Sequence, residues 1–323
     1  MSFQAREIPR AQGLYNPVFE HDACGIGAVV NMHGQKSHKI ILQALTILKN
    51  LAHRGGAGSE SNTGDGAGIL IQIPDKFFRQ ACPSAGIELP SAGEYGAGMV
   101  FLPRGRENRG RCEQKIEEIV AEEGLNILGW RTCPVNQDRL GEAAKASRPF
   151  IRQLFIGKRG DIGDTMAFER RLYVVRKRCE SLCMGLPESS PDYFYFASLS
   201  CRTIVYKGML TADQVAAFYV DLTSLQVESA LALVHSRYST NTFPSWERAH
   251  PYRYIIHNGE INTIRGNVNW MRSRQSGINT ECFGTNIERL FPIINENGSD
   301  SAMFDNCLEF LHLAGRSLPH AAM

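Results

Sequence analysis

The sequence has little that would place the protein in a membrane, in an oxidising compartment or on nucleic acid. Its 323 residues contain no apolar run near the roughly 20 residues that a membrane-spanning helix requires. The nine cysteines are an odd number without paired C-x-x-C spacing, in a chain too long to need disulfide bonds for stability. With 35 basic and 33 acidic residues, the net charge of +2 gives no field for nucleic acid or anionic lipid. We therefore expect a cytoplasmic protein with neither nucleic-acid nor membrane partners.

Signatures of metal sites and of targeting are also missing. The HExxH pattern is absent, and Cys179 and Cys183 have no second pair nearby, so we expect no metal site. Residues 1–23 contain no apolar segment of the secretion-signal type, and they carry acidic residues that transit peptides avoid. Two basic runs, residues 104–111 and 170–177, lack repeated aromatic residues for base stacking, and we interpret both as solvated faces.

What the sequence does contain begins at Cys24, which stands at the head of an apolar, strand-like run that reaches Val30. A thiol is a good nucleophile only as the thiolate, so a catalytic cysteine needs a nearby base or a lowered pKa. If Cys24 is the first residue of the working protein, its own α-amino group, with a pKa of roughly 7.7 to 8.0, can be that base. A buried structural cysteine at the start of a strand is the alternative interpretation.

A glycine-rich segment follows the first predicted helix. Residues 39–52 have apolar side chains at helical spacing, and residues 69–73 form an apolar, strand-like run. The segment between them, residues 53–68, is predicted to be a loop. A mobile lid over a site, a phosphate-binding loop and a plain surface loop all remain open. The phosphate-binding interpretation is the weakest, because the Lys-Ser/Thr ending and the strand-then-helix order are missing.

The rest of the chain predicts layered helices and strands. Residues 193–199 and 203–206 are expected to pair with each other as strands. Further strands are expected at residues 95–102, 125–130, 150–156, 230–235 and 252–256, and helices at residues 111–123, 168–183 and 303–313.

Polar residues follow two of these apolar runs and precede the last helix. They are residues 236–242, 257–262 and 297–301. Polar groups at the end of a buried strand often line a site, but each group also has a plainer interpretation. An arginine such as Arg237 is more often a solvated charge, Asn258-Gly259 is a common hairpin turn, and Ser299 or Asp300 can simply cap a helix.

Five motifs, taken together and in this order, resemble the class II glutamine amidotransferases, and in particular the N-terminal glutaminase domain of the glutamate synthase large subunit. The motifs are Cys24-Gly25, His53-Arg54-Gly55, Arg237-Tyr238-Ser239-Thr240-Asn241-Thr242, His257-Asn258-Gly259-Glu260-Ile261-Asn262 and Gly298-Ser299-Asp300-Ser301. The resemblance implies an α+β fold, the four-layer αββα sandwich of Ntn hydrolases. It also implies a leader or propeptide at residues 1–23 and an amidotransferase domain at residues 24–323.

The resemblance assigns catalytic and binding roles to individual residues. Cys24 corresponds to the nucleophile, and its α-amine to the proton acceptor. The Asn258 side chain and the Gly259 backbone N–H correspond to the oxyanion hole. Arg237 is implied to hold the α-carboxylate of glutamine, and Asp300 its α-ammonium group.

Two further residues complete the implied substrate site. Arg54 is expected to steady the cysteine end of the site, with the glycine-rich loop closing over bound glutamine, and Thr240 is expected to contact the substrate. Asn241 stands where several other class II amidotransferases have histidine, which favours glutamate synthase within the class.

The implied reaction is the hydrolysis of L-glutamine to L-glutamate and ammonia through a cysteinyl thioester. In the complete family enzyme the ammonia passes to a synthase region that carries FMN and an iron–sulfur cluster, and a small subunit is a further candidate partner. We expect no cofactor in this chain. Because the sequence ends soon after the helix that follows Asp300, we expect a C-terminally truncated domain. A catalytically inactive module with a binding or assembly role is the alternative function.

Overall fold

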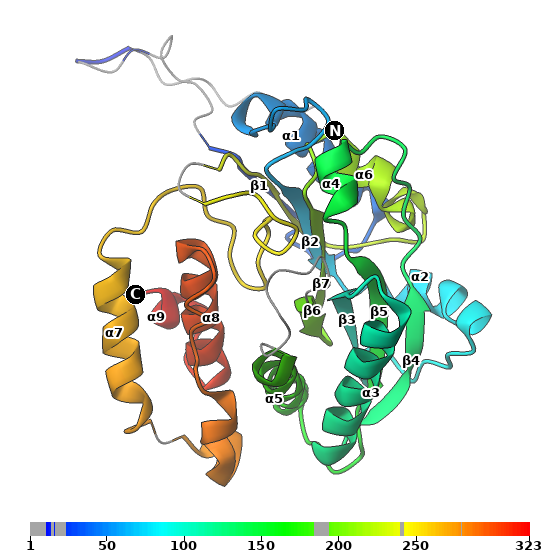
Figure 1. Ribbon diagram of the computed structural model, residues 1–323, viewed down its shortest axis with the longest axis vertical. Coiled ribbons are helices and arrows are strands. Elements are labelled where there is room, and N and C mark those ends of the chain that lie inside the picture. The colour runs from blue at the N-terminus through cyan, green and yellow to red at the C-terminus, as the bar shows by residue number, and fades with distance from the viewer. Residues whose placement is uncertain (1–10, 14–15, 17–23, 184–193, 240–241, 279) are drawn as a thin grey trace.

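Two four-stranded antiparallel sheets form the centre of the protein in the computed structural model, which describes residues 11–13, 16, 24–183, 194–239, 242–278 and 280–323 (Figure 1). The first sheet has the strand order β1 (Ile26–Val30), β8 (Leu231–Ser236), β2 (Ala67–Gln72) and β7 (Thr203–Gly208). The second has the order β4 (Asn126–Thr132), β5 (Phe150–Gly157), β3 (Tyr95–Leu102) and β6 (Tyr195–Ser200).

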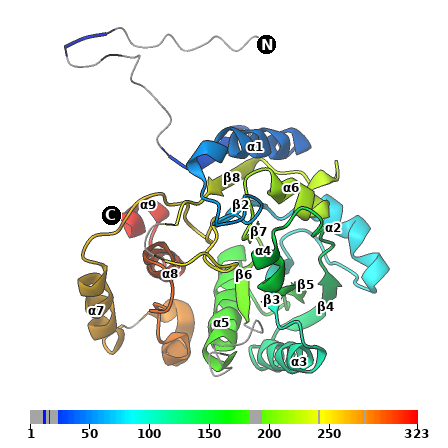
Figure 2. The same ribbon diagram turned by 45° about the horizontal axis from the view of Figure 1, so that its top comes forward.

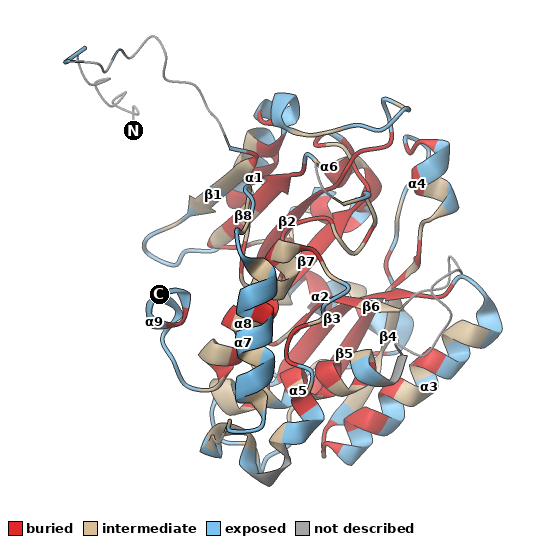
Figure 3. Ribbon diagram, turned by 60° about the vertical axis from the view of Figure 1, so that its left-hand side comes forward, coloured by how far each residue is buried: buried red, intermediate tan, exposed pale blue. Residues whose placement is uncertain are grey.

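Helices cover the outer faces of the two stacked sheets. Figure 2 shows four layers in succession: α1 (His38–Asn50), the first sheet, the second sheet, and then α3 (Arg106–Glu122) with α5 (Thr165–Cys183). Side chains of β3 alternate between two cores, because successive residues of a strand point to opposite faces. Met99 and Phe101 contribute to the core shared by the two sheets, whereas Val100 and Leu102 pack with α3 and α5. The expected αββα sandwich is therefore confirmed, and most of its strands are buried, whereas the edge strands β1 and β4 are partly exposed (Figure 3).

A second group of helices lies beside the sandwich. Figures 1 and 2 show α7 (Ile264–Gln275) and α8 (Asp300–Leu313) next to each other, with α9 (Leu318–Ala322) close to α8. The remaining helices are α2 (Asp75–Ala81), α4 (Glu142–Ala146) and α6 (Gln214–Phe218), with 3₁₀ helices η2 (Ala52–Arg54), η3 (Pro83–Ala85), η4 (Val220–Thr223) and η5 (Glu281–Leu290). Of the helices in the described part of the chain, none is both long enough and apolar enough to cross a membrane.

Two predictions about strands are wrong. The predicted pair at residues 193–199 and 203–206 forms β6 and β7, which belong to different sheets because β6 pairs with β3 and β7 with β2. Residues 252–256 form no strand. The backbone N–H groups of Tyr254 and Ile255 donate to the carboxylate of Asp305 instead of to a neighbouring strand.

The interpretation of the two basic runs is confirmed for most of the first and wrong for part of the second. The arginines at positions 104, 106 and 111 are exposed, whereas Arg109 is half-buried over the ring of Phe150. In α5, however, Arg176 is 1% exposed and pairs with Glu309, while the ammonium group of Lys177 donates to the carbonyl oxygens of Pro292 and Ile293. The acceptors come from segments more than a hundred residues away, so the run itself gives no sign of them.

Candidate active site

A cavity of about 270 Å³ lies where the end of β8 meets the beginning of α8. Four residues predicted to act on substrate line it, and they are Arg237, Asn258, Gly259 and Asp300. Pockets for drug-sized ligands are typically roughly 300 to 1,000 Å³, so this cavity suits a smaller molecule of amino-acid size.

A backbone hydrogen bond holds the start of β1, next to Cys24, beside this cavity. The backbone N–H of Ser236 donates to the carbonyl oxygen of Gly25 over 2.7 Å. Gly25 is buried, and a Cβ atom placed on it would overlap the carbonyl oxygen of Ser236 and lie 3.0 Å from Oδ1 of Asn258. Glycine is therefore required here for the close approach of the two segments. Cys24 itself is exposed at the end of the strand and is not among the residues that line the cavity.

Arg237 presents an unsatisfied cationic group to the cavity. Its side chain is 8% exposed, and its Nη2 donates to the hydroxyl of Thr242 over 2.6 Å. Its Nη1 is buried and has no hydrogen-bond partner among the described residues. Burial lowers the pKa of the guanidinium from its ordinary value, which reflects the cost of keeping this charge away from water. A bound carboxylate would satisfy the free donor and offset that cost.

The segment that carries Asn258 and Gly259 is irregular and is held by side chains from two elements. At one end, Nε2 of His235 lies 2.8 Å from the carbonyl oxygen of His257. At the other end, Oδ2 of Asp300 accepts a hydrogen bond of 2.9 Å from the backbone N–H of Ile261. The two residues predicted to form the oxyanion hole thus lie between two fixed points.

Asp300 occupies the first turn of α8. Ser299 caps that helix through a hydrogen bond to the backbone N–H of Ala302, so part of the alternative interpretation as a helix cap is correct. Asp300 is not the cap, and its carboxylate lines the cavity. Its Oδ1 accepts both the backbone N–H and the hydroxyl of Ser301, whereas its Oδ2 accepts only the backbone N–H of Ile261 and retains a second lone pair for a cationic ligand.

The glycine-rich loop packs against the end of β8. The backbone N–H of Gly56 donates to the carbonyl oxygen of Arg237, and the Asp65 carboxylate accepts a hydrogen bond of 2.7 Å from the backbone N–H of Ser239. Residues 63–66 are buried, which contradicts a plain surface loop for that half of the segment. Residues 57–59 are exposed, and closure of this part over a ligand remains a prediction.

Two residues predicted to bind substrate are not placed in the cavity. Arg54 ends the 3₁₀ helix η2, is exposed, and is not among the residues that line the cavity. Thr240 and the neighbouring Asn241 lie outside the described residues.

Sequence reasoning assigned no role to two histidines that line the cavity. The rings of His235 and His250 stack with centroids 4.3 Å apart. Burial lowers the pKa of His235 to about 4 and that of His250 well below its ordinary value, so both are neutral at neutral pH. His235 was predicted only as the last residue of a buried strand. A single polar residue at the end of an apolar run is the available signal.

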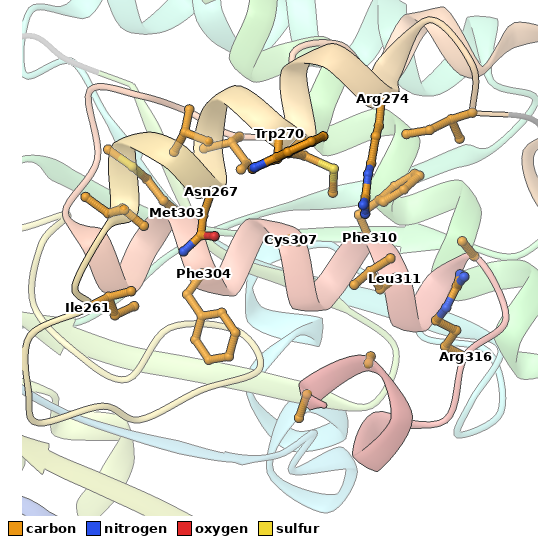
Figure 4. Close-up of a pocket in the computed structure, with 18 of the residues that line it drawn as sticks. Ile261, Asn267, Trp270, Arg274, Met303, Phe304, Cys307, Phe310, Leu311 and Arg316 are labelled. Carbon is orange, nitrogen blue, oxygen red and sulfur yellow. The ribbon is translucent and has the colours of Figure 1, made fainter.

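A larger cavity of about 980 Å³ separates α7 from α8 and α9, and it carries no comparable chemistry. Figure 4 shows side chains of α7, including Trp270, and of α8, including Phe310 and Leu311, along its two walls. Its lining is largely apolar, without the arrangement of carboxylate, amide and guanidinium groups found in the smaller cavity. Within the described ranges, no three or more His, Cys, Asp or Glu side chains are grouped so as to hold a metal ion.

Comparison with known proteins gives a consistent result. The family model of class II glutamine amidotransferases matches residues 24–323. Over 317 residues the chain is 53% identical to the glutamate synthase (NADPH) large chain of Bacillus subtilis, covering 98% of this chain and 20% of that protein. It is 46% identical over 330 residues to the glutamate synthase (NADH) of Saccharomyces cerevisiae, and 40% identical over 308 residues to ferredoxin-dependent glutamate synthase 2 of a Synechocystis strain. These alignments cover 99% and 95% of this chain, and 15% and 19% of the two proteins. The chain therefore spans a fifth or less of the length of these relatives.

Proposed function

The chain belongs to the class II glutamine amidotransferases, and from this membership we propose that it acts as the glutaminase part of a glutamate synthase. In this role it hydrolyses L-glutamine to L-glutamate and ammonia through a thioester on Cys24. The observation that carries the proposal is the single cavity lined by Arg237, Asn258, Gly259 and Asp300, with the residue after Cys24 packed against Asn258.

Cys24 attacks the side-chain amide carbon of glutamine. The thiol gives its proton to the α-amine of the same residue, and a sulfur–carbon bond forms while the carbonyl electron pair moves to oxygen. When the tetrahedral intermediate collapses, the carbon–nitrogen bond breaks and the α-ammonium returns its proton to the leaving ammonia. Water then adds to the thioester, which releases glutamate and restores the thiol.

Asn258 and Gly259 stabilise the negative oxygen of the intermediate. The side-chain amide of Asn258 and the backbone N–H of Gly259 are both donors. An oxyanion-hole donor contributes roughly 3 to 4 kcal/mol when it is aimed at the charge that develops. The hydrogen bonds at both ends of their segment support this role, because they restrict the movement of the backbone that carries the two donors.

Arg237 and Asp300 recognise the amino-acid end of glutamine. The unpartnered Nη1 of Arg237 is suited to the α-carboxylate, and the second lone pair of Asp300 Oδ2 is suited to the α-ammonium group. We also propose that Arg54 and Thr240 bind the substrate, and that Arg54 does so at the end of the site next to Cys24, as the family resemblance implies. We further propose that the glycine-rich loop closes over bound glutamine.

The remainder of the longer enzyme is proposed to use the ammonia. By resemblance, its synthase region carries FMN and an iron–sulfur cluster, and a small subunit is a candidate partner. Glutamine hydrolysis needs neither cofactor, because it transfers no electrons. An iron–sulfur cluster also requires grouped cysteine ligands, which the described part of this chain does not provide. Glutamate synthases named for NADPH, NADH and ferredoxin all align with this chain. This supports a reaction that the three kinds of glutamate synthase have in common.

We propose a cytoplasmic location, in keeping with the cysteine pattern.

The proposed reaction requires a free α-amine on Cys24, and we therefore propose that residues 1–23 are removed as a leader. The family match that spans residues 24–323 supports this boundary. The exposure of Cys24 at the end of β1 is also compatible with cleavage before it.

A glutaminase assay tests the proposal directly. The chain, with its N-terminus defined by mass spectrometry, should release ammonia and glutamate in equal amounts from L-glutamine. L-Asparagine, which is one methylene shorter, is the matched control substrate and should react far more slowly. A folded chain that starts at Cys24 and releases no ammonia would favour the alternative, a non-catalytic module with a binding or assembly role.

A further inference from the structure

His235 contacts the segment that carries Asn258 and Gly259, but none of the proposed steps assigns it a role. It is on β8, the strand between β1 and β2 in the first sheet. Its side chain is 1% exposed, and its Nε2 lies 2.8 Å from the carbonyl oxygen of His257. A carbonyl oxygen can only accept, so Nε2 carries the hydrogen and donates it. His257 is the residue directly before Asn258, so this bond reaches the oxyanion segment from the central sheet.

The ring of His235 is held in one orientation. Its backbone is in register with Ile26 of β1 on one side and Gly68 of β2 on the other. Its ring stacks on that of His250, with 23° between the ring planes. Because burial lowers the pKa of His235 to about 4, the ring is neutral in neutral solution and keeps the tautomer with hydrogen on Nε2.

The other end of the segment is fixed by α8. Asp300 accepts the backbone N–H of Ile261, so Asn258 and Gly259 lie in an arc held at both ends. On the basis of the proposed glutaminase reaction, we propose that His235 is a positioning residue, whose donated hydrogen bond sets the direction of the Asn258 and Gly259 donors. His235 does not have to touch glutamine to act in this way.

This role predicts an effect on turnover rather than on substrate binding. Oxyanion donors act on charge that develops in the transition state, whereas the amino-acid end of glutamine is held by Arg237 and Asp300. Loss of the bond would misplace the donors and leave the other contacts in place. Misplacement by about 1 Å can cost on the order of 100-fold in rate.

Three variants separate positioning from simple structural support. His235→Phe keeps an aromatic ring against His250 but removes the donor. In His235→Gln the amide nitrogen stands three bonds from Cβ, as Nε2 does in histidine, so the donor is restored. In His235→Asn the amide is one bond too short to reach. The full chain carrying each substitution should be compared with the unsubstituted chain for kcat, KM and thermal unfolding temperature.

We expect His235→Phe and His235→Asn to lower kcat by about 10- to 100-fold with KM within about threefold, and His235→Gln to recover most of the loss. The γ-aldehyde analogue of glutamine, whose carbonyl carbon accepts the Cys24 thiol to give a tetrahedral adduct, should bind more weakly by a similar factor. L-Glutamate, which forms no such adduct, should bind equally well to all variants.

Other results would overturn the inference. It is wrong if kcat is unchanged in His235→Phe, if KM rises as much as kcat falls, or if Gln is no better than Asn. If His235→Phe does not fold, the positioning role is tested by comparing His235→Gln with His235→Asn, provided that the two variants unfold at similar temperatures. If the unsubstituted chain has no glutaminase activity, the proposed function is contradicted. The rates of the His235 variants test the positioning role when the unsubstituted chain is active.

Discussion

The backbone N–H of Ser236 donates to the carbonyl oxygen of Gly25 over 2.7 Å, and this bond joins the end of β8 to the residue that follows Cys24. Three successive residues of β8 and its extension thus serve the site. The side chain of His235 holds the Asn258 segment, the backbone of Ser236 holds the cysteine end, and the guanidinium of Arg237 faces the cavity. The nucleophile is accordingly tied to the sheet that carries the other groups.

The first prediction concerns Cys24. Cys24→Ser should lower ammonia release from L-glutamine by about 1,000-fold or more, because the hydroxyl is a far weaker nucleophile than the thiolate. Glutamine binding, measured by calorimetry, should persist. Cys282→Ser, which changes a partly exposed cysteine in η5, is the matched control and should leave the rate unchanged. Undiminished ammonia release from Cys24→Ser would contradict the assignment.

The same cysteine should be the first to react with an alkylating agent. Cys24 is exposed, whereas burial raises the pKa of Cys82 to about 12 and raises the pKa of Cys133 and Cys179. At neutral pH, one equivalent of iodoacetamide should therefore label Cys24 and abolish activity, and saturating L-glutamate should slow the labelling. Peptide mapping by mass spectrometry identifies the labelled residue.

The second prediction tests recognition of the α-carboxylate by Arg237. Arg237→Lys keeps the positive charge but loses the planar pair of donors, so KM for glutamine should rise by about 10- to 100-fold. The value of kcat should change much less, because the carboxylate contact is equal in the ground state and the transition state. Arg106→Lys on the exposed beginning of α3 is the control. A large fall in kcat at unchanged KM would show that Arg237 acts in the chemical step instead.

Much of the sandwich could be predicted from the sequence, because local apolar patterns decide it. The strand expected at residues 95–102 has the bounds of β3, and the helix expected at residues 39–52 differs from α1 only at its ends. The wrong predictions concern contacts between residues that are far apart in the sequence. Residues 252–256 show an apolar, strand-like pattern, but their N–H groups find the carboxylate of Asp305, a partner that no local pattern reveals.

The site shows the same limit. The motifs indicated Arg237, Asn258, Gly259 and Asp300, and the cavity brings all four together. His235 was not identified, because a lone histidine at the end of an apolar run is most simply a core residue. Its role depends on a contact with His257, 22 residues further along the chain.

The third prediction concerns the stability of the buried ionic network behind the site. Asp305 is 0% exposed and pairs with Arg253, whose side chain is 7% exposed, at 3.3 Å. Asp305→Ala leaves this guanidinium partly unpaired and removes the acceptor of three backbone N–H groups, which should lower the free energy of unfolding by about 3 to 5 kcal/mol. Glu107→Ala, in an exposed pair with Arg111, is the control and should cause no measurable change in urea unfolding. Equal effects of both substitutions would contradict this account.

The fourth prediction follows from the buried histidines. The pKa of His235 is about 4 in the folded protein and about 6.5 in the unfolded chain, so between these values the unfolded state binds more protons. Stability is therefore complete above about pH 7 and is lost as the pH falls, with His235 contributing a loss of about 2 kcal/mol between pH 7 and pH 5. The lowered pKa of His250 acts in the same direction.

Urea unfolding at the two pH values measures this effect. Carboxylates also destabilise the folded state on acidification, so the decisive quantity is the difference between the parent chain and His235→Gln, which cannot titrate. The variant should lose less stability than the parent over this interval. Identical pH dependence of the two proteins would show that His235 is not held neutral by burial.

The last prediction concerns residues 1–23. The proposed base is the α-amine of Cys24, but in the sequence as written this nitrogen forms the peptide bond with Ala23. An amide nitrogen is not basic, so the uncleaved chain should be inactive even with Arg237 and Asp300 in place. Cleavage before Cys24 should restore activity, and the rate should rise with pH through roughly 7 to 8 as the freed ammonium group loses its proton.

Intact-mass and N-terminal analysis of the active species checks this directly. The matched control is a chain produced with one extra alanine before Cys24, which keeps the thiol and every binding group but moves the free amine to another residue. Its turnover should be lower by about 100-fold or more, because a general base in the correct position contributes about 10²- to 10⁴-fold. If a species that still carries Met1 hydrolyses glutamine at the full rate, the α-amine of Cys24 cannot be the base, and another group must take the proton from the thiol.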